Sequence, residues 1–132
     1  MAKYHPRLKI SSTPPEFRGV FERLREILRE HSSRFIVSGD GPDFYCLQVR
    51  SSPRFKKSFP IAWVKISSSY VSFHFMPIYF APDLQQGLSP VLKKRMQGKS
   101  CFNFRTIDED LFTELRELTS RGFSLSRKMR VV

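Results

Sequence analysis

The sequence predicts an α+β domain: an antiparallel sheet of about five strands with helices packed on one face, in the order α-β-β-β-β-α-β-α. Three observations lead to this prediction. Apolar residues near the start recur at the 3.6-residue spacing of an amphipathic helix. From Arg34 onward the period changes to two, which is typical of strands with one buried face. A second long apolar stripe at helical spacing follows the strands, so a run of closely linked strands lies between two helices.

The first helix is predicted from its start pattern, Thr13-Pro14-Pro15-Glu16. Thr13 is expected to cap the first turn, proline suits the first helical position, and Glu16 completes a capping box. The apolar stripe that follows consists of Phe17, Val20, Phe21, Leu24 and Leu28, with Ile27 beside them. We expect this stripe to lie on the sheet, with the intervening Arg and Glu side chains in solvent.

Four strands are then predicted at residues 34–38, 44–50, 61–66 and 70–76. Phe35 and Val37 share one side of the first strand, and a Gly-Asp-Gly-Pro turn separates it from the second. Pro53 argues that the basic loop 51–57 does not continue the ladder.

The last two of these strands form a hairpin around Ser67-Ser68-Ser69, and this hairpin is the predicted centre of the fold. Its second strand alternates cleanly. One side carries Val71, Phe73 and Phe75, and the other carries Ser72, His74 and Met76. We expect the first set in the core and the second on a semi-polar face. Pro77 then ends or bends the strand.

The C-terminal part adds a short helix, a strand and a long helix. Ser89 and Pro90 begin the short helix, Gly98 suits its end, and residues 99–105 form the strand. Either Thr106 or Asp108 can cap the last helix, which Gly122 is expected to end. Its apolar stripe consists of Leu111, Phe112, Leu115 and Leu118. Residues 1–132 then form one domain, with a compact core at 13–122, an arm at 1–12 and a basic tail at 123–132. We expect Phe123 to pack back onto the helix end and residues 124–132 to be mobile.

Length and composition indicate a single globular domain. A chain of 132 residues with 40% hydrophobic residues can bury a core without disulfides or metal. We expect Cys46 and Cys101, both in strand-like segments, to be buried free thiols. No apolar run approaches 18 residues and the first ten residues contain no apolar h-region. The chain is therefore expected to be cytoplasmic, without a membrane partner and without a cofactor.

Positive charge is concentrated in the strands and their loops. The formal net charge is +11, and between residues 44 and 107 there are ten basic residues against a single acid, Asp83. A field of one sign attracts anions over about 8–10 Å in ordinary salt.

Three short segments give the sequence a resemblance to a known family. They are Trp63-Val64-Lys65, Tyr70-Val71-Ser72-Phe73-His74-Phe75 and Met96-Gln97-Gly98-Lys99-Ser100-Cys101-Phe102-Asn103-Phe104. With the order of elements over about residues 13–122, they resemble the YdhG-like bacterial domains of frataxin-like fold, a family of largely unknown function. The resemblance implies an iron-binding or iron-chaperone role as one alternative. In frataxin-type proteins iron is associated with an acidic ridge on the first helix, whereas here that helix alternates Arg and Glu.

The sequence contains no strong catalytic or metal-binding pattern. His5, His31 and His74 are not spaced as ligands, and the acidic residues 108–110 are explained by their place at a helix start. Gly98-Lys99-Ser100 resembles the end of a P-loop but lacks the earlier glycine and the strand-to-helix order. We therefore predict no catalytic residue and no metal ligand. A role that is not enzymatic ranks ahead of the remaining alternative, an enzyme with a pocket formed late in the chain.

The candidate site is instead an anion-binding surface. Two groups of basic residues carry it, Lys93, Lys94, Arg95 and Lys99 around the short helix and Arg54, Lys56 and Lys57 in the basic loop. Aromatic residues lie near both groups, as in surfaces that bind phosphates and stack bases, so the expected partner is a phosphate-bearing ligand, a nucleic acid or another polyanion. The alternative is that the basic residues are ordinary surface and the aromatics are core. A candidate pocket on the outer sheet face consists of Trp63, Lys65, Tyr70 and His74. The oligomeric state is left open.

Overall fold

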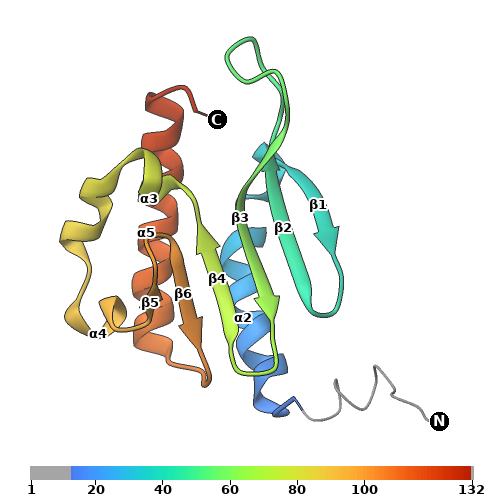
Figure 1. Ribbon diagram of the computed structural model, residues 1–132, viewed down its shortest axis with the longest axis vertical. Helices are drawn as coiled ribbons and strands as arrows, with labels where there is room; N and C mark the ends of the chain where they lie inside the picture. Colours follow the sequence, from blue (N-terminus) through green and yellow to red (C-terminus); the bar gives the residue numbers. More distant parts are fainter. Residues whose placement is uncertain (1–12, 132) are drawn as a thin grey trace.

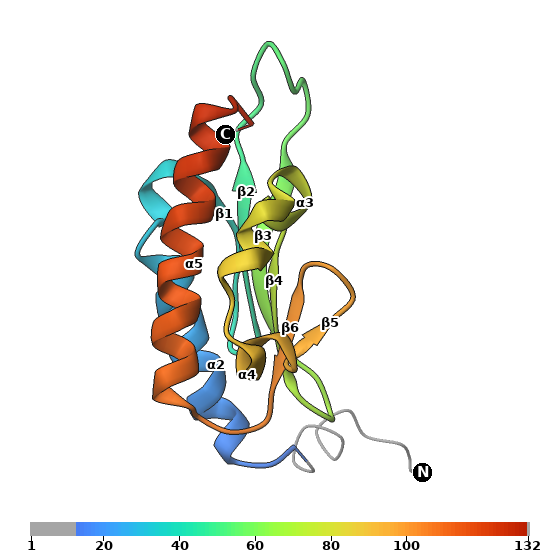
Figure 2. The ribbon, with the colours of Figure 1, turned by 90° about the vertical axis from the view of Figure 1, so that its left-hand side faces the viewer.

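The computed structural model describes residues 13–131 and consists of one sheet and one layer of long helices. Helix α2 (Glu16–Arg29) and helix α5 (Glu109–Lys128) cover the same face of the sheet, and no other long helix of the described residues lies over the opposite face (Figures 1 and 2). This arrangement confirms the predicted α+β class. The predicted arm at residues 1–12 lies outside the described residues.

The sheet has six strands where about five were expected, and every neighbouring pair is antiparallel. The strands are β1 (Ile36–Asp40), β2 (Phe44–Val49), β3 (Phe59–Ile66), β4 (Val71–Phe75), β5 (Met96–Gln97) and β6 (Cys101–Phe104). Their order in the sheet is β1-β2-β3-β4-β6-β5. The additional strand is β5, which has two residues and forms a hairpin with β6. Because β6 lies between β4 and β5, residues near 70 and residues near 100 become neighbours.

Short helices connect β4 to β5 around one edge of the sheet. They are α3 (Pro77–Phe80), the 3₁₀ helix η2 (Pro82–Gly87) and α4 (Pro90–Lys93), and another 3₁₀ helix, η1 (Ser32–Arg34), precedes β1. Pro77 ends β4 as predicted. Ser89 caps α4 as predicted, since its hydroxyl accepts a hydrogen bond of 3.1 Å from the backbone N–H of Leu92.

The core lies between the sheet and the two long helices. Val71, Phe73 and Phe75 are fully buried, which confirms the predicted inward side of β4. The stripe of α2 packs on the same core. Burying one such side chain contributes about 1.5–3 kcal/mol, so this two-layer contact is the main source of stability.

Two element starts differ from the prediction. Helix α2 begins at Glu16, its N-cap residue is Pro15, and no side chain caps it, so the expected capping box of Thr13 does not form. The reason is the proline pair: a residue that precedes a proline avoids the helical region, and this keeps Pro14 out of the helix. Strand β1 begins at Ile36, two residues later than predicted, and an irregularity after Val37 leaves that side chain 41% exposed.

Both glycines that were expected to end helices have other roles. Gly98 (φ +74°) lies in the turn between β5 and β6, whereas α4 ends at Lys93. The left-handed backbone of this turn favours glycine. Helix α5 continues through Gly122 to Lys128, so residues 123–128 are helical, and Phe123 and Val131 are buried. The predicted helix end at Gly122 was therefore wrong: residues 123–128 of the predicted tail belong to α5, and Phe123 packs against Phe35 and Phe75.

Candidate anion-binding site

The two predicted basic groups lie at opposite ends of the molecule. Arg54, Lys56 and Lys57 belong to the long loop between β2 and β3, which extends beyond one end of the sheet, whereas α4 and β5 lie toward the other end (Figure 1). The guanidinium of Arg54 donates a hydrogen bond of 2.6 Å to the carbonyl of Met129, which holds it beside the end of α5. The basic residues therefore do not form one patch.

The group at the α4 end surrounds an open hollow of about 310 Å³, called here the basic hollow. Three chain segments line it: the turn before β4, the segment from α4 into β5, and β6 with the residue after it. Its lining residues are Ser69, Tyr70, Lys94, Arg95, Met96, Gln97, Asn103 and Arg105. Pairing of Val71 with Phe104 brings Tyr70 and Arg105 to the same point of the sheet. The backbone N–H of Asn103 donates to the carbonyl of Arg95 at 2.8 Å, which fixes Arg95 beside β6.

The basic hollow has three cationic side chains, Lys94, Arg95 and Arg105, and no carboxylate from residues 13–131 lines it. All three are exposed. Among the residues that the structure describes, the ion pairs use other arginines, Arg23, Arg29 and Arg116. The hollow therefore keeps an uncompensated positive field that favours anions.

Arg105 is held in place at the edge of the hollow. Its guanidinium donates a hydrogen bond to the carbonyl of Ser69 and lies 5.7 Å from the ring centroid of Phe17. Tyr70 comes next in the chain, where the turn 67–70 is closed by a 2.9 Å hydrogen bond from the backbone N–H of Ser67 to the carbonyl of Tyr70. These contacts reduce the conformational entropy that the Arg105 side chain and the Tyr70 backbone would lose on binding.

A network of polar side chains links the hollow to the middle of the uncovered sheet face. The amide of Asn103 donates to Gln97 Oε1 at 2.6 Å, and its own Oδ1 accepts from the hydroxyl of Ser72 at 2.9 Å. The thiol of Cys101 also reaches Asn103 Oδ1, at 3.3 Å. Three strands, β4, β6 and β5, thus present polar groups on one surface.

The network ends at an aromatic pair, Trp63 on β3 and His74 on β4. Their rings are stacked with centroids 4.6 Å apart, and His74 Nε2 lies 3.6 Å from Cys101 Sγ. Burial and the ammonium of Lys65 lower the pKa of His74. Burial raises the pKa of the Cys101 thiol, and a hydrogen bond with Ser72 offsets part of this rise. Both groups are therefore neutral at pH 7, and Cys101 is a poor nucleophile.

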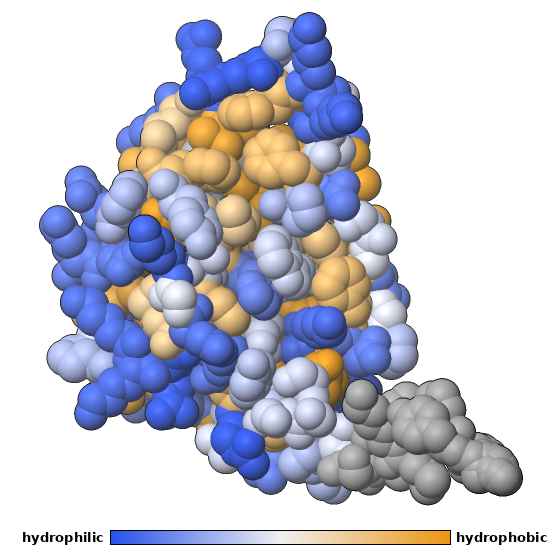
Figure 3. Space-filling model, viewed as in Figure 1, coloured by the Kyte–Doolittle hydropathy of each residue, from blue (hydrophilic) through white to orange (hydrophobic). Residues whose placement is uncertain are grey.

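Figure 3 looks onto this uncovered face, where polar and weakly polar side chains occupy the middle of the molecule. Of the predicted sheet-face pocket, Trp63, Lys65 and His74 lie on the face and Tyr70 lines the basic hollow. Of the predicted anion-binding residues, Lys94 and Arg95 line the hollow. Lys93 and Lys99 are exposed near it without lining it.

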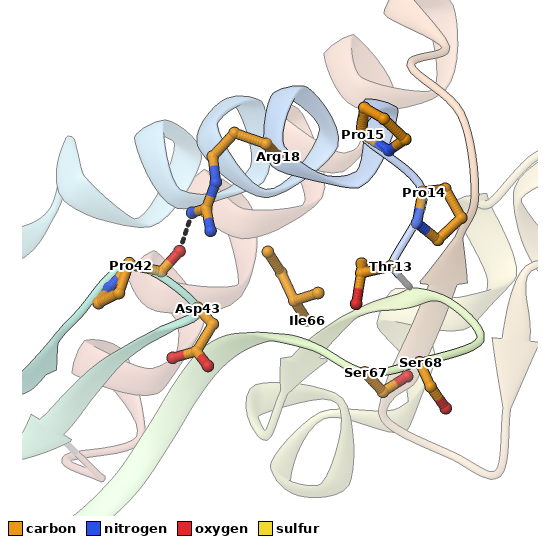
Figure 4. A pocket seen from close by; sticks show the side chains of 9 residues that line it. All are labelled: Thr13, Pro14, Pro15, Arg18, Pro42, Asp43, Ile66, Ser67 and Ser68. Atoms are coloured by element: carbon orange, nitrogen blue, oxygen red, sulfur yellow. Dashed lines mark hydrogen bonds between the residues drawn. The ribbon is translucent and has the colours of Figure 1, made fainter. Parts of the chain in front are cut away.

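A second hollow, of about 600 Å³, lies at the other end of the β3–β4 hairpin from the aromatic pair (Figure 4). Its lining residues are Thr13, Pro14, Pro15, Arg18, Pro42, Asp43, Ile66, Ser67 and Ser68. The guanidinium of Arg18 donates to the carbonyl of Pro42, and the carboxylate of Asp43 lies nearby. One cation against one carboxylate gives no excess charge, so this hollow does not attract a polyanion.

Within residues 13–131, no three His, Cys, Asp or Glu side chains come together as metal ligands. His31 packs edge-on against Phe123 in the helix layer, far along the chain from His74, and His5 lies outside the described residues. The iron-binding alternative therefore stays a prediction. No helix in the described part of the chain is both long and apolar enough to cross a membrane.

Sequence reasoning missed Arg105, Asn103 and Gln97 as site residues. One pattern could have identified Arg105. Tyr70 directly precedes β4 and Arg105 directly follows β6, and antiparallel pairing of these two strands places the two residues side by side. Comparisons with protein-family models, with curated proteins and with solved structures find no match.

Proposed function

We propose that this chain is a non-enzymatic binding module for anions that carry several phosphate groups, and that the basic hollow is its binding site. The observation that supports the proposal is the convergence of Lys94, Arg95 and Arg105 on one hollow without a carboxylate. A guanidinium matches two phosphate oxygens with parallel N–H donors, and an ammonium acts as a compact point charge.

The exposure of the three cations limits the affinity for one phosphate. An exposed ion pair contributes about 0.2–1 kcal/mol, so three of them contribute at most about 3 kcal/mol. A Kd of 1 mM corresponds to about 4 kcal/mol, so a single free phosphate binds more weakly than 1 mM. Useful affinity requires a ligand whose further phosphates reach other cations on or beside the same face, such as Lys65 and Lys99.

Charge reversal at two places tests the proposal. The site variant is Lys94→Glu/Arg95→Glu, and its matched control is Lys56→Glu/Lys57→Glu, which changes the formal charge equally in the loop at the opposite end. All four side chains are exposed, so folding is expected to be preserved. Binding of inorganic polyphosphate is measured by calorimetry at low and at moderate salt.

The site variant is expected to lose at least about tenfold in affinity, because two attractions become repulsions worth about 1.4 kcal/mol together. The control is expected to retain most of the wild-type affinity. Equal losses in the two variants would show that net charge, and not the hollow, determines binding. Absence of binding by the wild type at low salt would reject the proposed function.

A further inference from the structure

The basic hollow contains an aromatic ring and side-chain amides in addition to the cations that a phosphate would contact. The ring is that of Tyr70, and the amides are those of Gln97 and Asn103. A phosphodiester has no hydrogen-bond donor and no flat apolar surface, so it makes no use of the ring. The amide oxygens of Gln97 and Asn103 already accept hydrogen bonds within the polar network. A nucleobase has both a π face and edge groups that donate and accept hydrogen bonds.

The hollow is also continuous with a second aromatic group on the same face. Ser72, whose hydroxyl bonds Asn103 in the hollow, lies two residues from His74 on β4, or about 7 Å at 3.3 Å per residue. His74 stacks on Trp63, its partner on β3. Aromatic side chains and amides therefore follow one another along a path that starts at the cations.

The charges of the two layers differ in a way that suits a chain-like polyanion. Acidic side chains are concentrated on α2, α5 and their ends, whereas Asp83 is the one acid between residues 44 and 107. On or beside the uncovered face are Lys65, Lys94, Arg95, Lys99 and Arg105. The β5–β6 hairpin, with Lys99 in its turn, rises on the side of the sheet opposite to the long helices (Figure 2).

We infer that the ligand of this face is single-stranded nucleic acid. Its backbone phosphates lie against the cations of the basic hollow, one base contacts Tyr70, and the strand runs across the polar network toward Trp63. This inference rests on the proposed anion-binding function. A duplex is disfavoured, because its bases are stacked inside and cannot present a face to Tyr70 or Trp63.

The chain contains one tryptophan, Trp63, so its fluorescence reports directly on this face. The probes are single-stranded oligothymidylate and oligouridylate, a DNA duplex of the same length, and inorganic polyphosphate with a matching number of phosphates. Both single strands are expected to bind and to quench Trp63. Polyphosphate is expected to bind with a similar salt dependence and to leave the fluorescence unchanged, and the duplex is expected to bind more weakly than the single strands.

The base contact is tested with Tyr70→Leu and with Tyr79→Leu as control, since Tyr79 is a 51% exposed tyrosine on α3. Loss of one stacked base lowers affinity roughly tenfold. Tyr70→Leu is therefore expected to weaken oligonucleotide binding by about that factor and to bind polyphosphate normally, which also shows that the variant is folded. Tyr79→Leu is expected to leave both affinities unchanged.

The outcomes distinguish failure of the nucleic-acid assignment from failure of the proposed anion-binding function. Binding of all four probes without quenching, or equal affinity for the duplex and the single strands, overturns the assignment of single-stranded nucleic acid and leaves the phosphate site standing. Failure of every probe, polyphosphate included, rejects the proposed function itself. Equal loss of oligonucleotide affinity in the Tyr70 and Tyr79 variants overturns the contact with Tyr70.

Discussion

Gly122 lies in the second half of α5, where the helix passes close to the ring of Phe75 on β4, and replacing it with alanine tests the packing of the two layers. A Cβ added there would lie 2.5 Å from Cζ of Phe75, closer still to its Cε2, and 3.3 Å from Cβ of Pro77. Ordinary carbon contacts are about 3.5–4 Å. The substitution therefore forces either the ring or the helix to move.

The ring of Phe75 has little freedom to move. It is fully buried, with the ring of Phe123 at 5.2 Å and that of Phe73 at 6.2 Å between centroids. Overpacking of this kind costs about 1–3 kcal/mol, whereas Gly→Ala in a free helix gains about 1 kcal/mol. We expect a net loss of up to about 2 kcal/mol in the free energy of unfolding, which lowers the Tm by up to roughly 8 °C.

Urea denaturation of Gly122→Ala measures this loss, with Ser120→Ala as control on the exposed side of the same helix. The control is expected to gain up to about 0.5 kcal/mol, because alanine has the higher helix propensity. Adding Phe75→Leu removes the ring, so the two changes together should be coupled by about 0.5–3 kcal/mol. A Gly122→Ala variant that is more stable than the wild type would show that α5 and β4 are not in contact as described.

Three further outcomes are expected. The logarithm of the affinity for single-stranded oligonucleotide should fall linearly with the logarithm of salt concentration, with a slope of about −2 for three phosphate contacts. In Lys94→Ala/Arg95→Ala one contact is left and the slope should be about −0.7. Equal slopes in the two proteins would contradict the proposed site. Burial lowers the pKa of His31 and of His74, so the unfolded chain binds more protons and the free energy of unfolding should fall as pH drops below about 6.5. Replacing both histidines with glutamine should flatten this pH dependence in thermal melts. An unchanged dependence would show that His31 and His74 do not cause it. Asp108→Ala removes the N-cap hydrogen bond of 3.1 Å to Leu111 and should cost about 1 kcal/mol in urea denaturation, whereas Thr106→Ala should cost less.

The elements that the sequence predicted best are those whose burial follows a short repeat. The alternation at 70–76 identified the inward side of β4, because neighbouring side chains on a strand point to opposite faces. Helix and strand ends were harder, since one residue type serves several purposes. Glycine is common at helix ends, so Gly122 was expected to end α5. Only the position of the Phe75 ring shows that Gly122 instead lets the helix pack closely against β4.

The candidate site depended on contacts that no local pattern contains. Lys94 and Arg95 were predicted from local charge density, and they do line the hollow. Arg105 and Tyr70 meet there only because β6 inserts between β4 and β5, and the two-residue β5 forms only through its pairing with β6. The loop with Lys56 and Lys57 has a similar charge density, so the sequence alone did not separate it from the hollow.

Anion binding in the basic hollow is tested most directly by amide chemical-shift mapping of the isotope-labelled protein. Pyrophosphate is titrated at low salt, and each backbone amide reports on its own surroundings. We expect shifts concentrated at the residues that line the basic hollow, namely Ser69, Tyr70, Lys94, Arg95, Met96, Gln97, Asn103 and Arg105. Shifts centred on the loop at 50–58, or spread evenly over all basic residues, would contradict it.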